Sequence, residues 1–217
     1  MGKVFYVMKK RGIIISTFVL MILLIDQVSK VWIKTTMTLG ESIRVFDWFY
    51  ILFIENDGMA FGMTLGSKLF LTVFRLLLIV AIVYYVIKLV RRKYKLSFLL
   101  CLSLILAGAM GNLIDCLFYG VIFFESTFFD VANLSLTDGY AALFYGKVVD
   151  MLYFPLFTIP TWVPFVGGDI FFSPVFNFAD SAITVGFVWL FLFHREDFSI
   201  TLDDVFKKKK IEDASKN

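Results

Sequence analysis

The chain has 217 residues, of which 59% are hydrophobic and only 18% are charged. An ordinary soluble domain has roughly 45–50% apolar and about 25% charged residues. This composition excludes a water-soluble globular domain, a disordered chain and a nucleic-acid-binding module, and it leaves an integral membrane protein. The two cysteines cannot form the disulfide framework of a small secreted domain.

Four segments are apolar enough to cross a bilayer as helices, which takes about 20 residues each. They run over residues 12–33, 69–87, 96–118 and 176–193. Their positions do not alternate between polar and apolar residues, so they predict helices and not barrel strands. The basic start of the chain resembles a signal peptide, but no small-residue cleavage site follows, and we expect a retained helix.

Basic residues indicate the orientation, because cytoplasmic segments are rich in Lys and Arg. They cluster before the first span, between the second and third spans, and after the fourth, whereas residues 119–175 hold only Lys147. The pattern predicts that both termini face the cytoplasm and that residues 35–67 and 119–175 face outward. The polar tail over residues 195–217 is expected to be mobile.

The outward segments carry structure of their own. Residues 43–54 are rich in β-branched and aromatic types and predict a short strand or hairpin. Residues 151–166 are uncharged but contain prolines, so we expect them to lie in the membrane interface and not to form a fifth span. The sequence therefore predicts one membrane domain over residues 1–217. Its fold class is all-α, with four transmembrane helices, a small β-containing outer segment and an interfacial loop or helix insert.

Ionisable residues within the spans are costly, at about 2.5–3.5 kcal/mol for Asp at the centre of a helix, and are functional candidates. Asp26, Arg75, Asp115 and Asp180 all fall toward the predicted outer ends of their spans. We therefore expect these four charges to occupy one layer near the outer face of the membrane.

Amide side chains accompany two of the acids. Asn112 precedes Asp115, and Asn177 precedes Asp180, by one helical turn in each case. Two carboxylates from adjacent helices can share a proton, so that one activates water while the other polarises a carbonyl. A proton or ion path, or structural ion pairs with Arg75, would also account for charges in this layer.

Five motifs in order resemble the lipoprotein signal peptidase (signal peptidase II) family of intramembrane aspartic endopeptidases. The matching segments are Asp26-Gln27-Val28-Ser29-Lys30, Asn56-Asp57-Gly58-Met59-Ala60-Phe61-Gly62, Gly108-Ala109-Met110-Gly111-Asn112-Leu113-Ile114-Asp115, Val148-Val149-Asp150 and Phe176-Asn177-Phe178-Ala179-Asp180-Ser181-Ala182-Ile183. The family commonly has Arg after the first catalytic Asp, where this chain has Cys116, so Arg75 or Lys147 is a candidate to supply the missing cation.

The resemblance and the depth of the charges together indicate roles for ten residues. Asp115 and Asp180 would be the catalytic pair. Asn112 and Asn177 would orient the pair, and Asn56 and Gly58 would line the substrate site. The supporting residues would be Asp26, Lys30, Arg75 and Asp150.

The resemblance also implies a substrate. It would be a diacylglyceryl-modified prolipoprotein, cut on the N-terminal side of its lipidated cysteine at the outer face of the bacterial inner membrane. We expect no metal or other cofactor, membrane lipids but no nucleic acid as partners, and a monomer. Two other classes stay open: a small proton-coupled transporter, and a non-catalytic scaffold that binds lipoprotein precursors.

Overall fold

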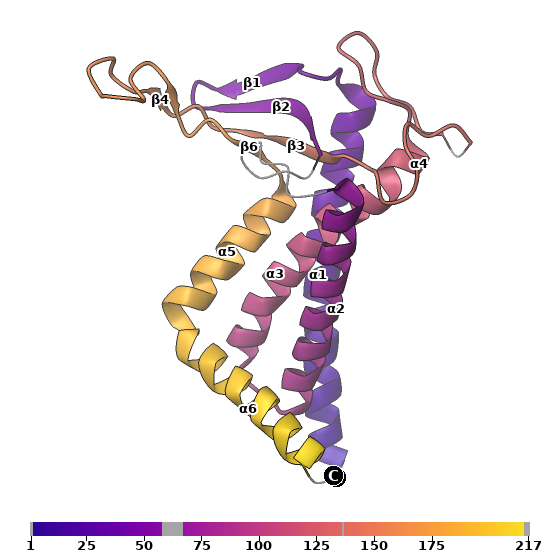
Figure 1. Cartoon of the computed structure of the whole chain (residues 1–217), viewed down its shortest axis with the longest axis vertical. Coiled ribbons are helices and arrows are strands. Elements are labelled where there is room, and N and C mark those ends of the chain that lie inside the picture. Colours follow the sequence, from indigo (N-terminus) through magenta and orange to yellow (C-terminus); the bar gives the residue numbers. More distant parts are fainter. Residues whose placement is uncertain (1, 58–66, 136, 215–217) are drawn as a thin grey trace.

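The computed structural model describes residues 2–57, 67–135 and 137–214, and it places a helical bundle beneath a small sheet (Figure 1). The long helices are α1 (Gly2–Thr36), α2 (Lys68–Arg91), α3 (Leu96–Ile114), α5 (Phe178–Phe193) and α6 (Arg195–Ala214). After α3 the chain continues through a π-helical turn, η1 (Asp115–Tyr119), and the short helix α4 (Gly120–Ile122).

Three helical segments are long and apolar enough to cross a membrane: Tyr6–Thr36, Lys68–Arg91 and Leu96–Ile122. The fourth predicted span corresponds to α5, a shorter apolar helix of 16 residues. The predicted ranges therefore locate all four helices, although α1 begins ten residues before the predicted span.

The all-α prediction is too narrow. β1 (Ser42–Phe46), β2 (Phe49–Asn56), β3 (Val148–Tyr153) and β6 (Val175–Phe176) form an antiparallel sheet in the order β1-β2-β3-β6. The first pair confirms the strands expected within residues 43–54. β3 and the first residue of β6 come from the segment predicted to face outward, residues 119–175, whose described residues after Ile122 contain no helix. The fold is mixed because apolar strand residues of the insert pair with β2.

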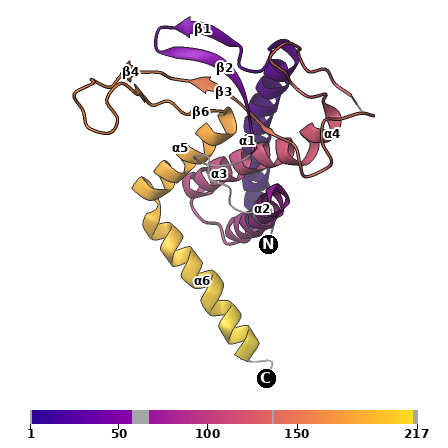
Figure 2. The ribbon, with the colours of Figure 1, turned by 45° about the horizontal axis from the view of Figure 1, so that its top comes forward.

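β4 (Phe157–Thr158) and β5 (Ile170–Phe171) pair with each other in an arm that extends from the sheet. In Figures 1 and 2 this arm and the loops of residues 123–135 and 137–147 extend to opposite sides of the molecule.

α3 is the central helix, and small residues let its neighbours approach it. A Cβ atom on Gly108 would lie 2.2 Å from the carbonyl oxygen of Ala179, and one on Gly186 would lie 2.6 Å from the Ile105 side chain. Gly108 on α3 and Gly186 on α5 therefore allow the two helices to pack closely. Gly111 similarly makes room for Asp26, whose Oδ2 would lie 2.5 Å from an added Cβ.

Two apolar clusters hold the ends of the bundle. One packs α2, α3 and α5 and includes Leu89, Phe98 and Leu102. The other joins α1 to η1 and the sheet through Ile33, Tyr119, Phe53 and Val149, among others. The second cluster fixes the sheet above the polar layer of the bundle.

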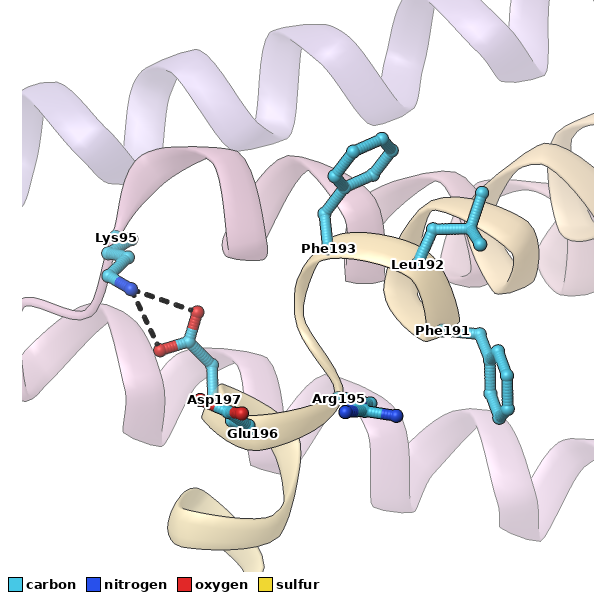
Figure 3. Close-up of a pocket in the computed structure, with 7 residues that line it drawn as sticks. All are labelled: Lys95, Phe191, Leu192, Phe193, Arg195, Glu196 and Asp197. Carbon is cyan, nitrogen blue, oxygen red and sulfur yellow. Dashed lines mark hydrogen bonds and ion pairs between the residues drawn. The ribbon is translucent and has the colours of Figure 1, made fainter.

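Most of the polar tail after His194, which the sequence predicts to be mobile, forms α6. The helix turns away from α5 at His194, whose Nδ1 lies 2.8 Å from Asp197 Oδ2, and Lys95 donates to both oxygens of Asp197 at 3.1 and 3.2 Å. The hydrogen bond from His194 lowers the pKa of Asp197. Figure 3 shows Lys95 and Asp197 beside a pocket of about 430 Å³ at the α5–α6 bend. Contacts to the α2–α3 turn therefore order a polar helix that has no continuous apolar stripe.

Candidate active site

A buried lysine organises the polar layer. Lys30 lies on α1 with no exposed surface, and its Nζ is 2.9 Å from Asp26 Oδ2, 2.8 Å from Asp115 Oδ2 and 2.9 Å from Asn112 Oδ1. Asp26 precedes Lys30 by one helical turn, so both side chains leave the same face of α1. Two carboxylates thus surround one ammonium group, which ties α1 to α3.

Asp26 also fixes the start of α5. Its Oδ1 accepts a hydrogen bond from the backbone N–H of Ala179 at 2.9 Å. A carboxylate at this position satisfies a free N–H of the first turn and complements the positive end of the helix dipole. Asp26 therefore supports the site by joining α1 to α5.

Asp115 is fully enclosed. Besides Lys30, Gln27 Nε2 donates to its Oδ1 at 2.9 Å, and the backbone N–H of Val149 donates to its Oδ2 at 3.3 Å. Gln27 also donates to the carbonyl oxygen of Gly111 and accepts from the Tyr119 hydroxyl. A cation and two N–H donors stabilise the charged form of this carboxylate and occupy both of its oxygens.

Asp180 is more accessible and lies at the N-terminus of α5. Asn112 Nδ2 donates to its Oδ1 at 2.7 Å, and the backbone N–H of Asn177 donates to its Oδ2 at 3.3 Å. The Asn177 side chain accepts in return from the Asp180 backbone N–H, which completes a capping box. Local sequence therefore fixes the carboxylate where α5 meets the sheet.

Asp150 lies next to this capping box. It belongs to β3 and is only 3% exposed. Asn177 Nδ2 donates to its Oδ1 at 2.7 Å and Asn56 Nδ2 donates to its Oδ2 at 3.2 Å, so the side chains that hydrogen bond to it are neutral amides. Burial raises the pKa of Asp150 to about 7, and the negative charge of Asp180 adds to the shift.

Asn177 connects the two acids that lie where α5 meets the sheet. Its backbone N–H binds Asp180, while its side-chain N–H group binds Asp150. It also donates to Asn112 Oδ1 at 3.1 Å. Asp150 and Asp180 therefore flank one asparagine, and their charges interact.

Most of the predicted site residues come together in this network. The structure joins Asp26, Lys30, Asn56, Asn112, Asp115, Asp150, Asn177 and Asp180. Gly58, predicted to line the substrate site, lies outside the described residues.

Arg75 reaches the same level from α2, where its NH1 group donates to Cys116 Sγ at 3.3 Å. The other candidate cation, Lys147, lies 3.4 Å from both Glu55 Oε2 and Glu125 Oε1. Lys30 is the cation that pairs with Asp115.

Sequence reasoning missed Gln27 as a site residue, although its motif was noted. A polar residue next to Asp26 in an apolar span was the available signal, but its bonds to Asp115 and Tyr119 depend on the packing of α1 against α3 and η1.

Fold and site together define a class: a membrane protein whose apolar bundle encloses several carboxylates in one polar layer beneath a sheet. The model of the signal peptidase (SPase) II family matches residues 18–195. The chain belongs to this family.

Named relatives agree with this assignment. A lipoprotein signal peptidase of Porphyromonas gingivalis (strain W83) is 49% identical over 199 residues, which cover 89% of this chain and 88% of the relative. Those of Amoebophilus asiaticus and Staphylococcus aureus are 37% and 30% identical, covering 81% and 90% of this chain and 75% and 94% of the relatives.

The fold is also similar to solved structures. One, described as a bacterial membrane enzyme structure by the in meso method at 2.3 Å resolution, has a TM-score of 0.59 and 26% identity and covers 85% of this chain and 89% of its own. A second, at 1.9 Å resolution, has a TM-score of 0.56 and the same identity, with 82% and 90% covered.

Proposed function

We propose that this chain is an intramembrane aspartic endopeptidase that removes the signal peptide from diacylglyceryl-modified prolipoproteins. The peptidase activity and the class of precursor follow from its membership of the signal peptidase II family. The observation that carries the chemistry is the pair of interacting carboxylates, Asp150 and Asp180, on either side of Asn177.

Asp180 belongs to both of the catalytic pairs that we consider. The sequence predicts Asp115 as its partner, and that assignment stays a prediction. The contacts support Asp150 more strongly, because Lys30, Gln27 and Val149 already occupy the oxygens of Asp115. We therefore assign the reaction to Asp150 and Asp180, and give Asp115 the role of holding Lys30 and β3 in place.

The two carboxylates differ in a way that suits acid–base chemistry. The raised pKa of Asp150 keeps its proton near neutral pH, so Asp150 donates a hydrogen bond to the scissile carbonyl oxygen. Asp180 accepts N–H bonds from Asn112 and Asn177 and takes a proton from the attacking water. The tetrahedral intermediate then collapses as the leaving amine receives that proton.

The position of the pair suits a lipidated substrate. Asp180 lies in the first turn of α5, which begins directly below the sheet at the end of the apolar bundle (Figure 1). A diacylglyceryl cysteine holds its acyl chains in the hydrocarbon layer and its peptide bond near the headgroups. The scissile bond and the two acids therefore meet at the same depth.

The chain is a bacterial membrane protein, and we infer its orientation from charge. The start of α1, the α2–α3 turn and α6 lie at the end opposite the sheet (Figures 1 and 2). These segments contain the basic clusters, which supports a cytoplasmic location for that end, four crossings and an outward-facing site. We propose that the protein acts as a monomer.

Single Asn variants of Asp115, Asp150 and Asp180 test the assignment. Each purified variant is given a diacylglyceryl-modified precursor in detergent, with Asp47→Asn as control because its side chain is 83% exposed. We expect no cleavage by Asp150→Asn or Asp180→Asn, and residual cleavage by the folded fraction of Asp115→Asn. Full activity in Asp150→Asn together with none in folded Asp115→Asn would return the catalytic role to Asp115.

A further inference from the structure

The arm between β3 and β6, residues 154–174, presents an apolar surface that the peptidase mechanism does not use. It carries a single ionisable residue, Asp169. Its large side chains are exposed, with Trp162 at 79% and Phe165 at 104% of full exposure. The other exposed apolar residues of the arm are Leu156, Phe157, Val166, Ile170, Phe171 and Phe172.

The arm is an ordered element. The Phe157 and Phe171 rings stack with centroids 4.7 Å apart across β4 and β5. Backbone hydrogen bonds from Ile159 to Asp169 and from Gly168 to Ile159 close the end loop at 2.8 and 2.9 Å. Phe165 has a φ of 69°, in the left-handed region that a bulky residue rarely adopts. The loop therefore holds its aromatic side chains outward on a fixed backbone.

The arm lies at the height of the C-terminal end of α1 (Figure 1). Exposed apolar residues follow α1 through Leu24 and Val28 to Trp32, and the helix ends at Thr36. In Figure 1 the sheet lies beside this end of α1, and the arm extends from the far side of the sheet. Below the arm, α5 exposes Phe187, Phe191 and other apolar side chains. Aromatic residues are typical of this headgroup-level zone of membrane proteins.

We propose that the end loop of the arm inserts Trp162 and Phe165 into the interfacial layer of the leaflet nearest the acid cluster. The occupant of this surface is phospholipid, because the arm is nearly free of charge and continues the lipid-facing surface of α5. An apolar, aromatic surface of this kind binds a membrane by burying its side chains at the boundary between headgroups and acyl chains.

Insertion of the arm also positions the catalytic acids, a consequence that rests on the proposed function. The arm follows the strand that carries Asp150 and precedes the capping box of Asp180. Its base is fixed to the sheet by Phe154, whose ring stacks on Phe49 at 4.7 Å and on Phe176 at 5.7 Å. Lipid contacts at the end loop thus set the depth of both acids relative to a membrane-bound substrate.

Fluorescence of Trp162 tests the insertion without reference to activity. A variant with Trp32, Trp48 and Trp189 changed to Phe retains only this indole, and the full chain is reconstituted in phosphatidylethanolamine–phosphatidylglycerol vesicles doped with brominated phosphatidylcholine. We expect blue-shifted emission, several-fold stronger quenching by bromine near the headgroups than at the chain ends, and weak quenching by iodide.

The matched control is Phe129→Trp in a chain that lacks the other tryptophans. Phe129 is 90% exposed but lies beside Asp130 in the opposite loop, so we expect iodide to quench it. If Trp162 behaves like this control, the insertion is refuted. Shielding of Trp162 from both quenchers would also refute it, because protein and not lipid would then cover the arm.

A Trp162→Ser/Phe165→Ser variant tests the positioning role. We expect kcat/KM in vesicles to fall by about tenfold, equivalent to about 1.4 kcal/mol, with unchanged kcat in detergent. Phe129→Ser serves as the control. Equal activity of variant and parent in vesicles would overturn the positioning role even if Trp162 is inserted. Loss of activity by the parent chain itself in detergent would instead count against the proposed function.

Discussion

Replacing Asp150 by Asn should abolish cleavage while making the folded protein more stable at neutral and alkaline pH. Asp150 is 3% exposed, and burial together with Asp180 raises its pKa from 3.8 to about 7. Since one pKa unit corresponds to about 1.4 kcal/mol, keeping the ionised form in the folded protein costs roughly 4 kcal/mol.

The direction in which stability changes with pH follows from proton binding. The folded state holds the Asp150 proton more tightly than the unfolded state does, so the free energy of unfolding falls as the pH rises from 3.8 to about 7. Asn is uncharged, like the protonated acid, so its presence does not lower the free energy of unfolding as the pH rises. The variant should therefore match the parent in stability near pH 4 and exceed it by up to about 4 kcal/mol above pH 7.

Two buried free cysteines provide the assay. Cys101 and Cys116 are both enclosed in the folded bundle, so a thiol-reactive fluorogenic maleimide reports their exposure on heating. We expect the Tm of Asp150→Asn to exceed that of the parent at pH 8 but not at pH 4.5. An Asp150→Asn variant that is less stable at pH 8, or that cleaves precursor at the parental rate, would refute the reasoning.

Three further predictions concern the same site and its support. The cleavage rate should fall as the pH rises above about 7, because Asp150 then loses its proton, and an unchanged rate up to about pH 9 would contradict this role. Lys30→Met should destabilise the protein by about 3–5 kcal/mol, because two buried carboxylates lose their cation. The control Arg44→Met removes an exposed ion pair and should cost at most about 1 kcal/mol. Equal shifts in Tm for the two variants would refute this prediction. Gly108→Ala should lower the Tm because its Cβ would meet the Ala179 carbonyl oxygen at 2.2 Å, whereas Gly12→Ala meets nothing within 4 Å and should not.

The sequence predicts the bundle well because membrane helices are specified by length and apolarity, which are local properties. The depth of each charge within its span likewise brings Asp26, Asp115 and Asp180 to one layer before any contact is known. Length and apolarity do not predict α6, because its sequence is polar and it contacts Lys95 of the α2–α3 turn.

The partners within the polar layer are harder to predict. Asn112 lies one turn before Asp115 but donates to Asp180, and Asp150 reaches the layer through the pairing of β3 with β2. Contacts of this layer join residues 94 positions apart in the bond from Asn56 to Asp150, and 153 positions apart in the bond from the Ala179 N–H to Asp26. Motif order identifies the residues, while only tertiary packing determines which acid faces which.

The most direct test of the account is cleavage of a diacylglyceryl-modified precursor beside its unmodified twin, with products identified by mass spectrometry. The account predicts that the parent chain cuts the modified precursor at the bond before the lipidated cysteine, that the twin is cut far more slowly, and that Asp180→Asn cuts neither. Equal cutting of both precursors would contradict the substrate assignment, and normal cutting by Asp180→Asn would contradict the aspartic mechanism.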